Sequence, residues 1–202
     1  IVGNARGGDF AFYRLVYGRG MSPTEWGQIG PDHDNQVEQN VLENFDTTGL
    51  DDGLYTLQLQ IVEHNQNVRQ AAIQLTVDNT PPAVDLTYPP EGQEYEYGFD
   101  EWVNINAEVK DNYAINRVEF YQGNWPEETE AVVVPEGVDP ASVPPQPQPT
   151  PFAVRSVAPF NVNWTLQGPG SYSFYVKVFD AAGNEVRTEP VEIFVVARAR
   201  PD

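Results

Sequence analysis

The sequence predicts an all-β protein built from two tandem antiparallel β-sandwiches. Two observations support this prediction: one motif occurs twice, and short alternating strands separated by turns fill both halves without helical periodicity. GLYTLQLQIVEHNQN at residues 53–67 aligns without a gap on GSYSFYVKVFDAAGN at residues 170–184. Such an internal duplication indicates two copies of one structural unit. We therefore expect one domain over residues 1–80 and a second over residues 81–202.

The repeated motif is itself expected to be a strand. Tyr55, Leu57, Leu59 and Ile61 alternate with polar residues, which is the period-two pattern of a strand with one buried and one solvated face. We expect further strands at residues 10–18, 37–45 and 71–77, and in the second domain at residues 83–88, 102–109, 115–123, 157–164, 171–179 and 191–197. Turn-rich segments at residues 18–23, 30–35 and 46–53 separate the strands of the first domain.

The first half lacks a segment that the second half has. No counterpart of AVDLTYPPEG, residues 83–92, occurs in residues 1–80, so we expect the first domain to lack its first strand. The sequence starts in strand-like IVGNA, and we expect it to be a piece of a longer protein whose export signal or anchor lies upstream. Pro81 and Pro82 restrict the backbone at the junction, which we expect to be short and stiff.

The second half carries an insertion. Between its Arg117 and Tyr172 it is fourteen residues longer than the first half is between Arg14 and Tyr55. The extra length falls on residues 135–151, whose seven prolines cannot donate to a strand ladder and favour an extended polyproline II segment. We expect a solvated loop there, with a proline-recognition segment as the alternative.

Composition excludes several classes of partner. Thirty acidic and eleven basic side chains give a net charge of -19, which repels phosphate backbones and anionic lipid headgroups. We therefore expect no nucleic acid partner and no direct membrane contact. Cysteine is absent, which excludes disulfides and thiolate chemistry. A membrane-spanning helix needs about 18 or more consecutive apolar residues, and no apolar run in the sequence is that long.

No recognisable catalytic motif occurs. The only lysines are Lys110 and Lys177, and neither a Ser-x-x-Lys nor a Lys-Thr-Gly sequence is present, so a penicillin-binding active site is excluded. Gly-x-Ser-x-Gly and HExxH are missing as well. His33 and His64 fall in predicted loops, where we expect them to be solvated. We therefore expect this chain not to be an enzyme.

The residues resemble a known class of repeat. G-x-Y, alternating hydrophobic residues, D-x-x-G-N, a strand and then V-D-N-T-P-P resemble the bacterial immunoglobulin-like and fibronectin III-like repeats of surface and cell-wall proteins. The resemblance implies an immunoglobulin-like sandwich in each half. It also implies that the hydroxyls of Tyr55 and Tyr172 bond back to the backbone at the start of the sixth strand. The first copy departs from the pattern, with Glu63 and Gln66 in place of Asp and Gly.

A narrower resemblance suggests a parent protein. FAFYRLVYGRGMSPTEWGQIG (residues 10–30) followed by LENFDTTGLDDGLYTLQLQIVE (residues 42–63) is similar to repeats in the C-terminal extension of class A penicillin-binding proteins, which are transglycosylases and transpeptidases. It is also similar to repeats in secreted proteases and adhesins. The resemblance implies a non-catalytic extracellular spacer or interaction module, on the outer side of the cytoplasmic membrane. Its partner would be peptidoglycan or another envelope protein.

Two interpretations are open for the polar residues of the repeated turn. The loop between the second and third strands and the loop between the sixth and seventh are expected at one end of the second sandwich. They bring Asp111, Asn112, Asp180 and Asn184 to the end where the linker brings Asp78 and Asn79. Oxygen groups of this kind could bind calcium at the interdomain junction. Alternatively, Gly183 adopts a positive backbone dihedral and the polar side chains bond their own turn, with no cofactor.

An aromatic segment offers a second candidate site. In EYEYGFDEW, residues 94–102, an extended backbone would set Tyr95, Tyr97 and Phe99 on one side. Such a row would suit stacking on the sugar rings of a cell-wall glycan, and packing at a sheet edge is the alternative.

Overall fold

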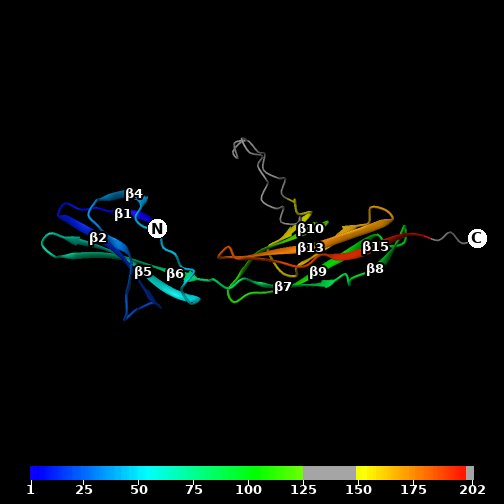
Figure 1. Ribbon diagram of the computed structural model, residues 1–202, viewed down its shortest axis with the longest axis horizontal. Coiled ribbons are helices and arrows are strands. Elements are labelled where there is room, and N and C mark those ends of the chain that lie inside the picture. The colour runs from blue at the N-terminus through cyan, green and yellow to red at the C-terminus, as the bar shows by residue number, and fades with distance from the viewer. Residues whose placement is uncertain (125–148, 199–202) are drawn as a thin grey trace, which may run out of the picture. The chain divides into compact units, whose positions relative to one another are not determined.

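The computed structural model describes residues 1–124 and 149–198. These residues form fifteen strands and no helix (Figure 1), which confirms the all-β prediction. Within those ranges there is accordingly no helix long and apolar enough to cross a membrane. The chain divides into two compact units, Ile1–Thr80 and Pro81–Asp202. Residues 135–148 of the proline-rich insertion lie outside the described residues.

The first unit is a small sandwich of two sheets. Its strands are β1 (Val2–Ala5), β2 (Phe10–Arg19), β3 (Gly27–His33), β4 (Val37–Val41), β5 (Gly53–Glu63) and β6 (Val68–Val77). One sheet has the order β3-β2-β5-β6 and the other pairs β1 with β4, all antiparallel. Both sheets contribute to one core, which contains Ala5, Tyr13, Leu15, Ile29, Leu42 and Leu57. Alternate residues such as Tyr13 and Leu15 of β2 therefore point between the sheets, as the period-two pattern predicts.

The second unit has the same plan with additional strands. They are β7 (Ala83–Tyr88), β8 (Gln93–Tyr97), β9 (Trp102–Lys110), β10 (Ile115–Gln122), β11 (Ala153–Arg155), β12 (Asn161–Thr165), β13 (Gly170–Asp180), β14 (Glu185–Arg187) and β15 (Val191–Ala197). The sheets have the orders β12-β9-β7 and β11-β10-β13-β15-β8, with β14 added beside β13. Of these pairs only β15 with β8 is parallel. Trp164 from one sheet packs against Phe174 from the other, with ring centres 5.0 Å apart. The surrounding core includes Ile105, Phe120 and Ile193.

The duplication seen in the sequence is present in the structure. β5 corresponds to β13, and each pairs with a preceding and a following strand of its own unit. β7 and β8 have no counterpart in residues 1–80, which confirms that the first sandwich lacks its first strand. Both tyrosine hydroxyls also bond back as expected: Tyr55 donates to the carbonyl of Asp51 at 3.0 Å and Tyr172 to that of Gly168 at 2.9 Å.

Three predictions about local structure were wrong. Residues 30–35 were expected to be a turn, but β3 continues to His33. β3 lies at the edge of its sheet and its pairing with β2 shifts register between Tyr13 and Leu15, and an edge tolerates Pro31, which has no N–H to donate. The strand expected at 37–45 ends at Val41, and the one expected at 157–164 begins only at Asn161, after Pro159.

Candidate functional sites

Two loops of the second unit meet at one of its ends, as predicted. Residues 111–114 connect β9 to β10, and residues 181–184 connect β13 to β14. The N–H of Ala181 donates to the carbonyl of Ala114 at 2.9 Å, so the loops are in direct contact. Asp111 and Asp180 consequently offer carboxylate oxygens within 4.8 Å of each other. The second unit itself therefore brings these two predicted carboxylates together.

Asp180 holds the repeated turn closed. Its side chain is 1% exposed, and its Oδ1 accepts the N–H groups of Gly183 at 2.7 Å and Asn184 at 2.8 Å. Its Oδ2 accepts the side-chain amide of Asn184 at 2.7 Å. Gly183 has φ +101°, which glycine adopts without steric cost. Asp180, Gly183 and Asn184 thus form a turn that is held by its own hydrogen bonds.

Asp111 has an oxygen that the turn does not use. Its Oδ2 accepts the N–H of Tyr113 at 2.8 Å, whereas its Oδ1 is buried without a hydrogen-bond partner. A buried acceptor without a partner is costly, and a second carboxylate nearby adds repulsion. A hard cation would offset both effects, because calcium prefers carboxylate and carbonyl oxygens. Asp111 and Asp180 thus offer oxygen ligands of the type that calcium binds, and a calcium ion would need further oxygens to complete its six to eight ligands.

The remaining predicted ligands are placed as follows. Asn112 lies in the same loop as Asp111. In the first unit, Asp78 accepts the N–H of Thr80 at 3.3 Å. Asn79 donates its side-chain amide to the carbonyls of Thr47 at 2.8 Å and Leu50 at 2.9 Å. That amide thus fixes the last residues of the first unit onto the loop before β5.

Asp52, which was not predicted as a site residue, also holds the end of the first unit. Asp52 accepts the backbone N–H of Asn79 at 2.7 Å and the hydroxyl of Thr80. Asp52 directly precedes the repeated Gly-x-Tyr motif, and its contact partners are 27 and 28 residues away. No local pattern reveals a pairing over that distance.

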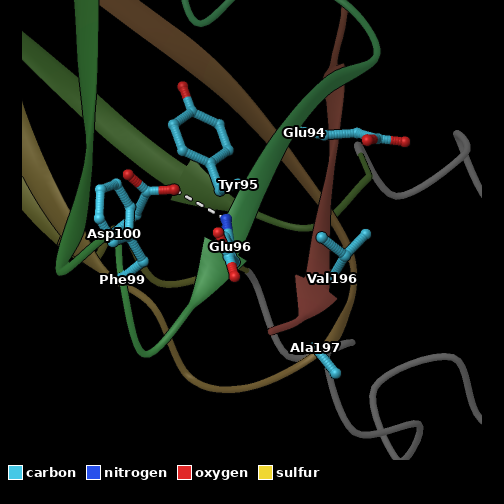
Figure 2. A pocket seen from close by; sticks show the side chains of 7 residues that line it. All are labelled: Glu94, Tyr95, Glu96, Phe99, Asp100, Val196 and Ala197. Carbon is cyan, nitrogen blue, oxygen red and sulfur yellow. Dashed lines mark hydrogen bonds between the residues drawn. The ribbon is translucent and has the colours of Figure 1, made fainter. Parts of the chain in front are cut away.

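An open pocket lies beside the parallel pair β8 and β15 (Figure 2). Its volume is about 510 Å³, and it is lined by Glu94, Tyr95, Glu96, Phe99, Asp100, Val196 and Ala197. Asp100 accepts the N–H of Glu96 at 2.7 Å through Oδ2, and the carbonyl of Glu96 accepts the N–H groups of Phe99 and Asp100. This tight turn leaves the Phe99 side chain 66% exposed.

The predicted row of three aromatic side chains is divided. Tyr95 is 9% exposed and belongs to the core of the second unit. Its pKa is raised, mainly because the side chain is buried. Gly98, at φ +86°, then turns the chain, so Tyr97 and Phe99 remain exposed without continuing one extended face. Arg198 approaches Glu96 at 3.6 Å and the centre of the Phe99 ring at 5.7 Å. The pocket thus combines an aromatic ring with carboxylate hydrogen-bond acceptors.

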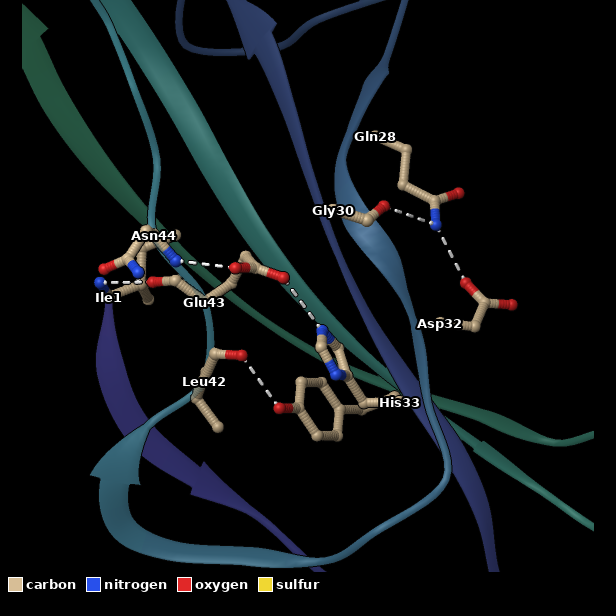
Figure 3. A network of polar contacts seen from close by, with 9 residues as sticks. Ile1, Gln28, Gly30, Asp32, His33, Leu42, Glu43 and Asn44 are labelled. Carbon is tan, nitrogen blue, oxygen red and sulfur yellow. Dashed lines mark hydrogen bonds and ion pairs between the residues drawn. The ribbon is translucent and has the colours of Figure 1, made fainter.

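A polar network in the first unit involves a residue that was expected to be solvated (Figure 3). His33 stacks on Tyr13 with ring centres 4.7 Å apart, and its Nε2 lies 3.1 Å from Glu43 Oε2. Tyr13 donates its hydroxyl to the carbonyl of Leu42 at 2.9 Å. The pKa of Glu43 is lowered overall. The hydrogen bond from the backbone N–H of Asn44 has the largest effect, burial raises the pKa, and His33 lowers it further. The prediction of a solvated His33 was wrong, because β3 carries it against β2.

The strand order and the two tyrosine hydroxyl bonds define both units as immunoglobulin-like, fibronectin III-like β-sandwiches. No protein-family model matches the chain, and no curated protein matches it. Among solved structures, the fibronectin(III)-like modules of Clostridium thermocellum CbhA are 15% identical, with a TM-score of 0.47 over 96% of this chain and 83% of that one. Dimeric latent PorU from Porphyromonas gingivalis is 12% identical, with a TM-score of 0.34 over 95% of this chain and 16% of that one. Neither likeness is close enough to add to the fold assignment.

Proposed function

We propose that this chain is a non-catalytic spacer or interaction module of an exported bacterial cell-envelope protein, located on the outer side of the cytoplasmic membrane. The observation that carries this proposal is how the polar side chains of the repeat are used. Asp180 accepts hydrogen bonds from its own turn, the hydroxyls of Tyr55 and Tyr172 bond to the backbone near the start of their strands, and Asn79 bonds to a loop carbonyl. A general acid or nucleophile must instead face a substrate with its proton or lone pair available.

The specific parent that we propose is a class A penicillin-binding protein, in which the chain is part of the C-terminal extension. The similarity of residues 10–30 and 42–63 to such repeats supports this parent. The test is the full-length polypeptide. A transpeptidase domain with Ser-x-x-Lys and Lys-Thr-Gly in the same protein supports the proposal, whereas a protease or a series of adhesin repeats contradicts it.

A second candidate function is binding of a cell-wall glycan. The exposed Phe99 ring, in a pocket that is also lined by Glu94, Glu96 and Asp100, favours it, because aromatic faces stack on sugar rings and carboxylates accept hydroxyl hydrogen bonds. The experiment is co-sedimentation with insoluble peptidoglycan. If the pocket binds glycan, Phe99→Ala reduces sedimentation and Phe194→Ala, an exposed phenylalanine outside the pocket lining, does not. A pure spacer gives no sedimentation with any variant.

We further propose that calcium binds at Asp111 and Asp180. The buried Oδ1 of Asp111 supports this proposal. Calcium is expected to raise the melting temperature saturably, because a ligand that binds only the folded state stabilises it. Magnesium at equal concentration should have less effect, since it demands a tighter octahedral set. In Asp111→Asn the calcium-dependent rise should be lost, and a melt of the unchanged protein that ignores both calcium and chelator contradicts the proposal.

A further inference from the structure

The outer face of one sheet of the second unit is rich in asparagine. This sheet has the order β12-β9-β7, and alternate residues of β9 and β12 are buried in the core. The residues between them point outward. They are Trp102, Asn104, Asn106, Glu108 and Lys110 on β9, and Asn161, Asn163 and Thr165 on β12. Asparagine is depleted in strands, so four asparagines among these eight positions call for a reason other than strand formation.

The asparagines lie directly opposite one another in two cross-strand pairs. Asn104 pairs in register with Asn163, and Asn106 pairs with Asn161. The side-chain amide of Asn104 donates to Oδ1 of Asn163 at 2.9 Å. The side-chain amide of Asn106 donates to the hydroxyl of Thr87 on β7 at 2.6 Å. These contacts link outward side chains of all three strands into an amide strip, which consists of Thr87, Trp102, Asn104, Asn106, Asn161, Asn163 and Thr165.

The amide strip keeps hydrogen-bonding groups for a ligand. A side-chain amide has two N–H donors and an oxygen with two lone pairs, and the bond between Asn104 and Asn163 uses one donor and one acceptor. Asn163 is exposed, and Asn104 and Asn106 are half-buried, so the strands hold the side chains in place while part of each amide is accessible. Donors and acceptors that lie side by side suit a ligand with hydroxyl groups, because a hydroxyl both donates and accepts.

An exposed tryptophan lies at one end of the amide strip. Trp102 is opposite Thr165 in the register, one step along the same face from the pair of Asn104 with Asn163. Trp102 is exposed, whereas Trp164, the other tryptophan of this sheet, is buried in the core. The large apolar ring of Trp102 therefore stays in contact with water, although its burial would be favourable. Its face is available for stacking on a flat apolar surface of a ligand.

The charge of the amide strip differs from that of the whole chain. The chain has a net charge of -19, yet no residue of the strip is charged. Charged residues occur further along the same face, where Asp85 is opposite Glu108. An acidic protein repels polyanions such as nucleic acids and polyuronates, and the centre of a protein interface is normally apolar, unlike this row of amides. An uncharged ligand with hydroxyl groups and apolar ring faces matches both the amides and the tryptophan.

We propose that the amide strip binds an extended, uncharged polysaccharide. Trp102 stacks on one sugar ring, and the asparagines form hydrogen bonds with hydroxyl groups of the adjoining rings. From Trp102 to Asn106 the strip is about 13 Å long, because outward residues of a strand follow each other at about 6.7 Å. A short stretch of an extended chain therefore fits along it. None of its residues lines the pocket that contains Phe99, and this inference depends neither on that pocket nor on the envelope role proposed above.

The test is affinity electrophoresis of the 202-residue protein in native gels that each contain one polysaccharide. Mixed-linkage β-glucan, glucomannan and galactomannan are the uncharged probes, and polygalacturonate is the anionic one. At least one uncharged polymer should retard the protein, and polygalacturonate should not, because both it and the protein are negatively charged. Trp102→Ala should weaken the apparent affinity about tenfold, because it removes the stacking surface. Asn163→Ala should weaken it about threefold, because it removes hydrogen bonds to the ligand.

Three further variants serve as controls. Trp26→Ala is the matched control for Trp102→Ala, because Trp26 is also exposed but lies between β2 and β3 of the first unit. Phe99→Ala removes the exposed ring of the pocket. Both should leave the retardation unchanged. Trp102→Phe keeps an aromatic face and should retain most of the affinity that Trp102→Ala loses. Circular dichroism checks that each variant is folded, as expected for changes at exposed residues.

Three results would overturn the polysaccharide site. The first is that none of the three uncharged polymers retards the protein. The second is that Trp102→Ala and Trp26→Ala are retarded to the same extent as the unchanged protein. The third is that Phe99→Ala abolishes the retardation while Trp102→Ala keeps it, because binding would then belong to the pocket and not to the amide strip.

Discussion

Gln66 and Gly183 occupy the same position in the two copies of the repeated turn. Both have positive φ, +68° at Gln66 and +101° at Gly183. A residue with a Cβ is strained in this region, whereas glycine is not. The backbone nevertheless reverses in the same way in both copies. The backbone N–H of Glu63 donates to the carbonyl of Asn67 at 2.9 Å, and the backbone N–H of Asp180 donates to the carbonyl of Asn184 at 3.1 Å. The first copy therefore keeps the turn at a conformational cost.

Replacing that residue should stabilise the first unit. We expect Gln66→Gly to raise the free energy of unfolding by about 0.5–1 kcal/mol, because relief of the left-handed strain outweighs the extra entropy of glycine. Gln70→Gly, in the extended backbone of β6, is the control and should lower it by about 0.5–1 kcal/mol. Urea unfolding followed by circular dichroism measures both, and a loss of stability in both variants contradicts the strain at Gln66.

Glu119 should make the second unit sensitive to acid. Burial raises the pKa of this carboxyl, but hydrogen bonds from Tyr121 and Arg117, both at 2.6 Å, and the charges of Arg117 and Lys177 outweigh it and leave the pKa below its usual value. A lowered pKa in the folded state adds stability above the unfolded value of about 4.3, and this stability is lost as pH falls through the folded pKa.

The measurement is the free energy of unfolding between pH 7 and pH 3. Glu119→Gln should be less stable than the unchanged protein at pH 7 and should lose less stability on acidification. Tyr121→Phe removes one of the two donors and keeps the carboxylate, so its acid-dependent loss should be intermediate. Parallel pH curves for Glu119→Gln and the unchanged protein would show that this carboxyl is not involved.

At the scale of elements, strands of about six residues or more could mostly be predicted, including the edge strand β7 at Ala83–Tyr88, whereas the shortest strands could not. β5 and β13 are each eleven residues long, β5 alternates from Tyr55 to Ile61, and each strand has a duplicate in the other half, so both were found. β11 and β14 have three residues each, too few for a period to be read. β3 contains Gly30 and Pro31, which indicate a turn locally, and only pairing with β2 makes the segment a strand. The turn around Asp180 was predictable because its bonds are local, whereas the orphan oxygen of Asp111 depends on packing between loops.

Contact between the two sheets of the second unit depends on β12. Trp164 is 4% exposed, packs on Phe174 and Tyr172, and donates its indole N–H to Gln122 at 2.9 Å. We expect Trp164→Ala to cost about 3–5 kcal/mol, because it opens a large cavity in the core. Trp102→Ala, on β9 and 52% exposed, should cost about 1 kcal/mol or less. Similar losses from the two tryptophans, measured by chemical unfolding, would contradict this account of the core.

At the scale of the whole molecule, charge opposes compaction. The chain has 30 acidic and 11 basic side chains, so most carboxylates have no opposite charge to pair with. The ion pairs of the described residues are largely at the surface, such as Arg6 with Glu38 at 2.9 Å, and exposed pairs contribute about 0–1 kcal/mol each. Net repulsion among the unpaired carboxylates should therefore exceed the attraction within the pairs.

This balance predicts the sign of the salt effect. Raising sodium chloride from about 20 mM to about 500 mM shortens the screening length from roughly 20 Å to roughly 4 Å, and should raise the melting temperature at pH 7 because repulsion is weakened more than attraction. The rise should disappear near pH 4.2, the isoelectric point, where net charge vanishes. Scanning calorimetry measures the melting temperature at low and high salt at both pH values. A chelator removes calcium, so that the effect of screening is not mixed with calcium binding at Asp111. A melting temperature that falls with salt at pH 7 would mean that the surface ion pairs dominate.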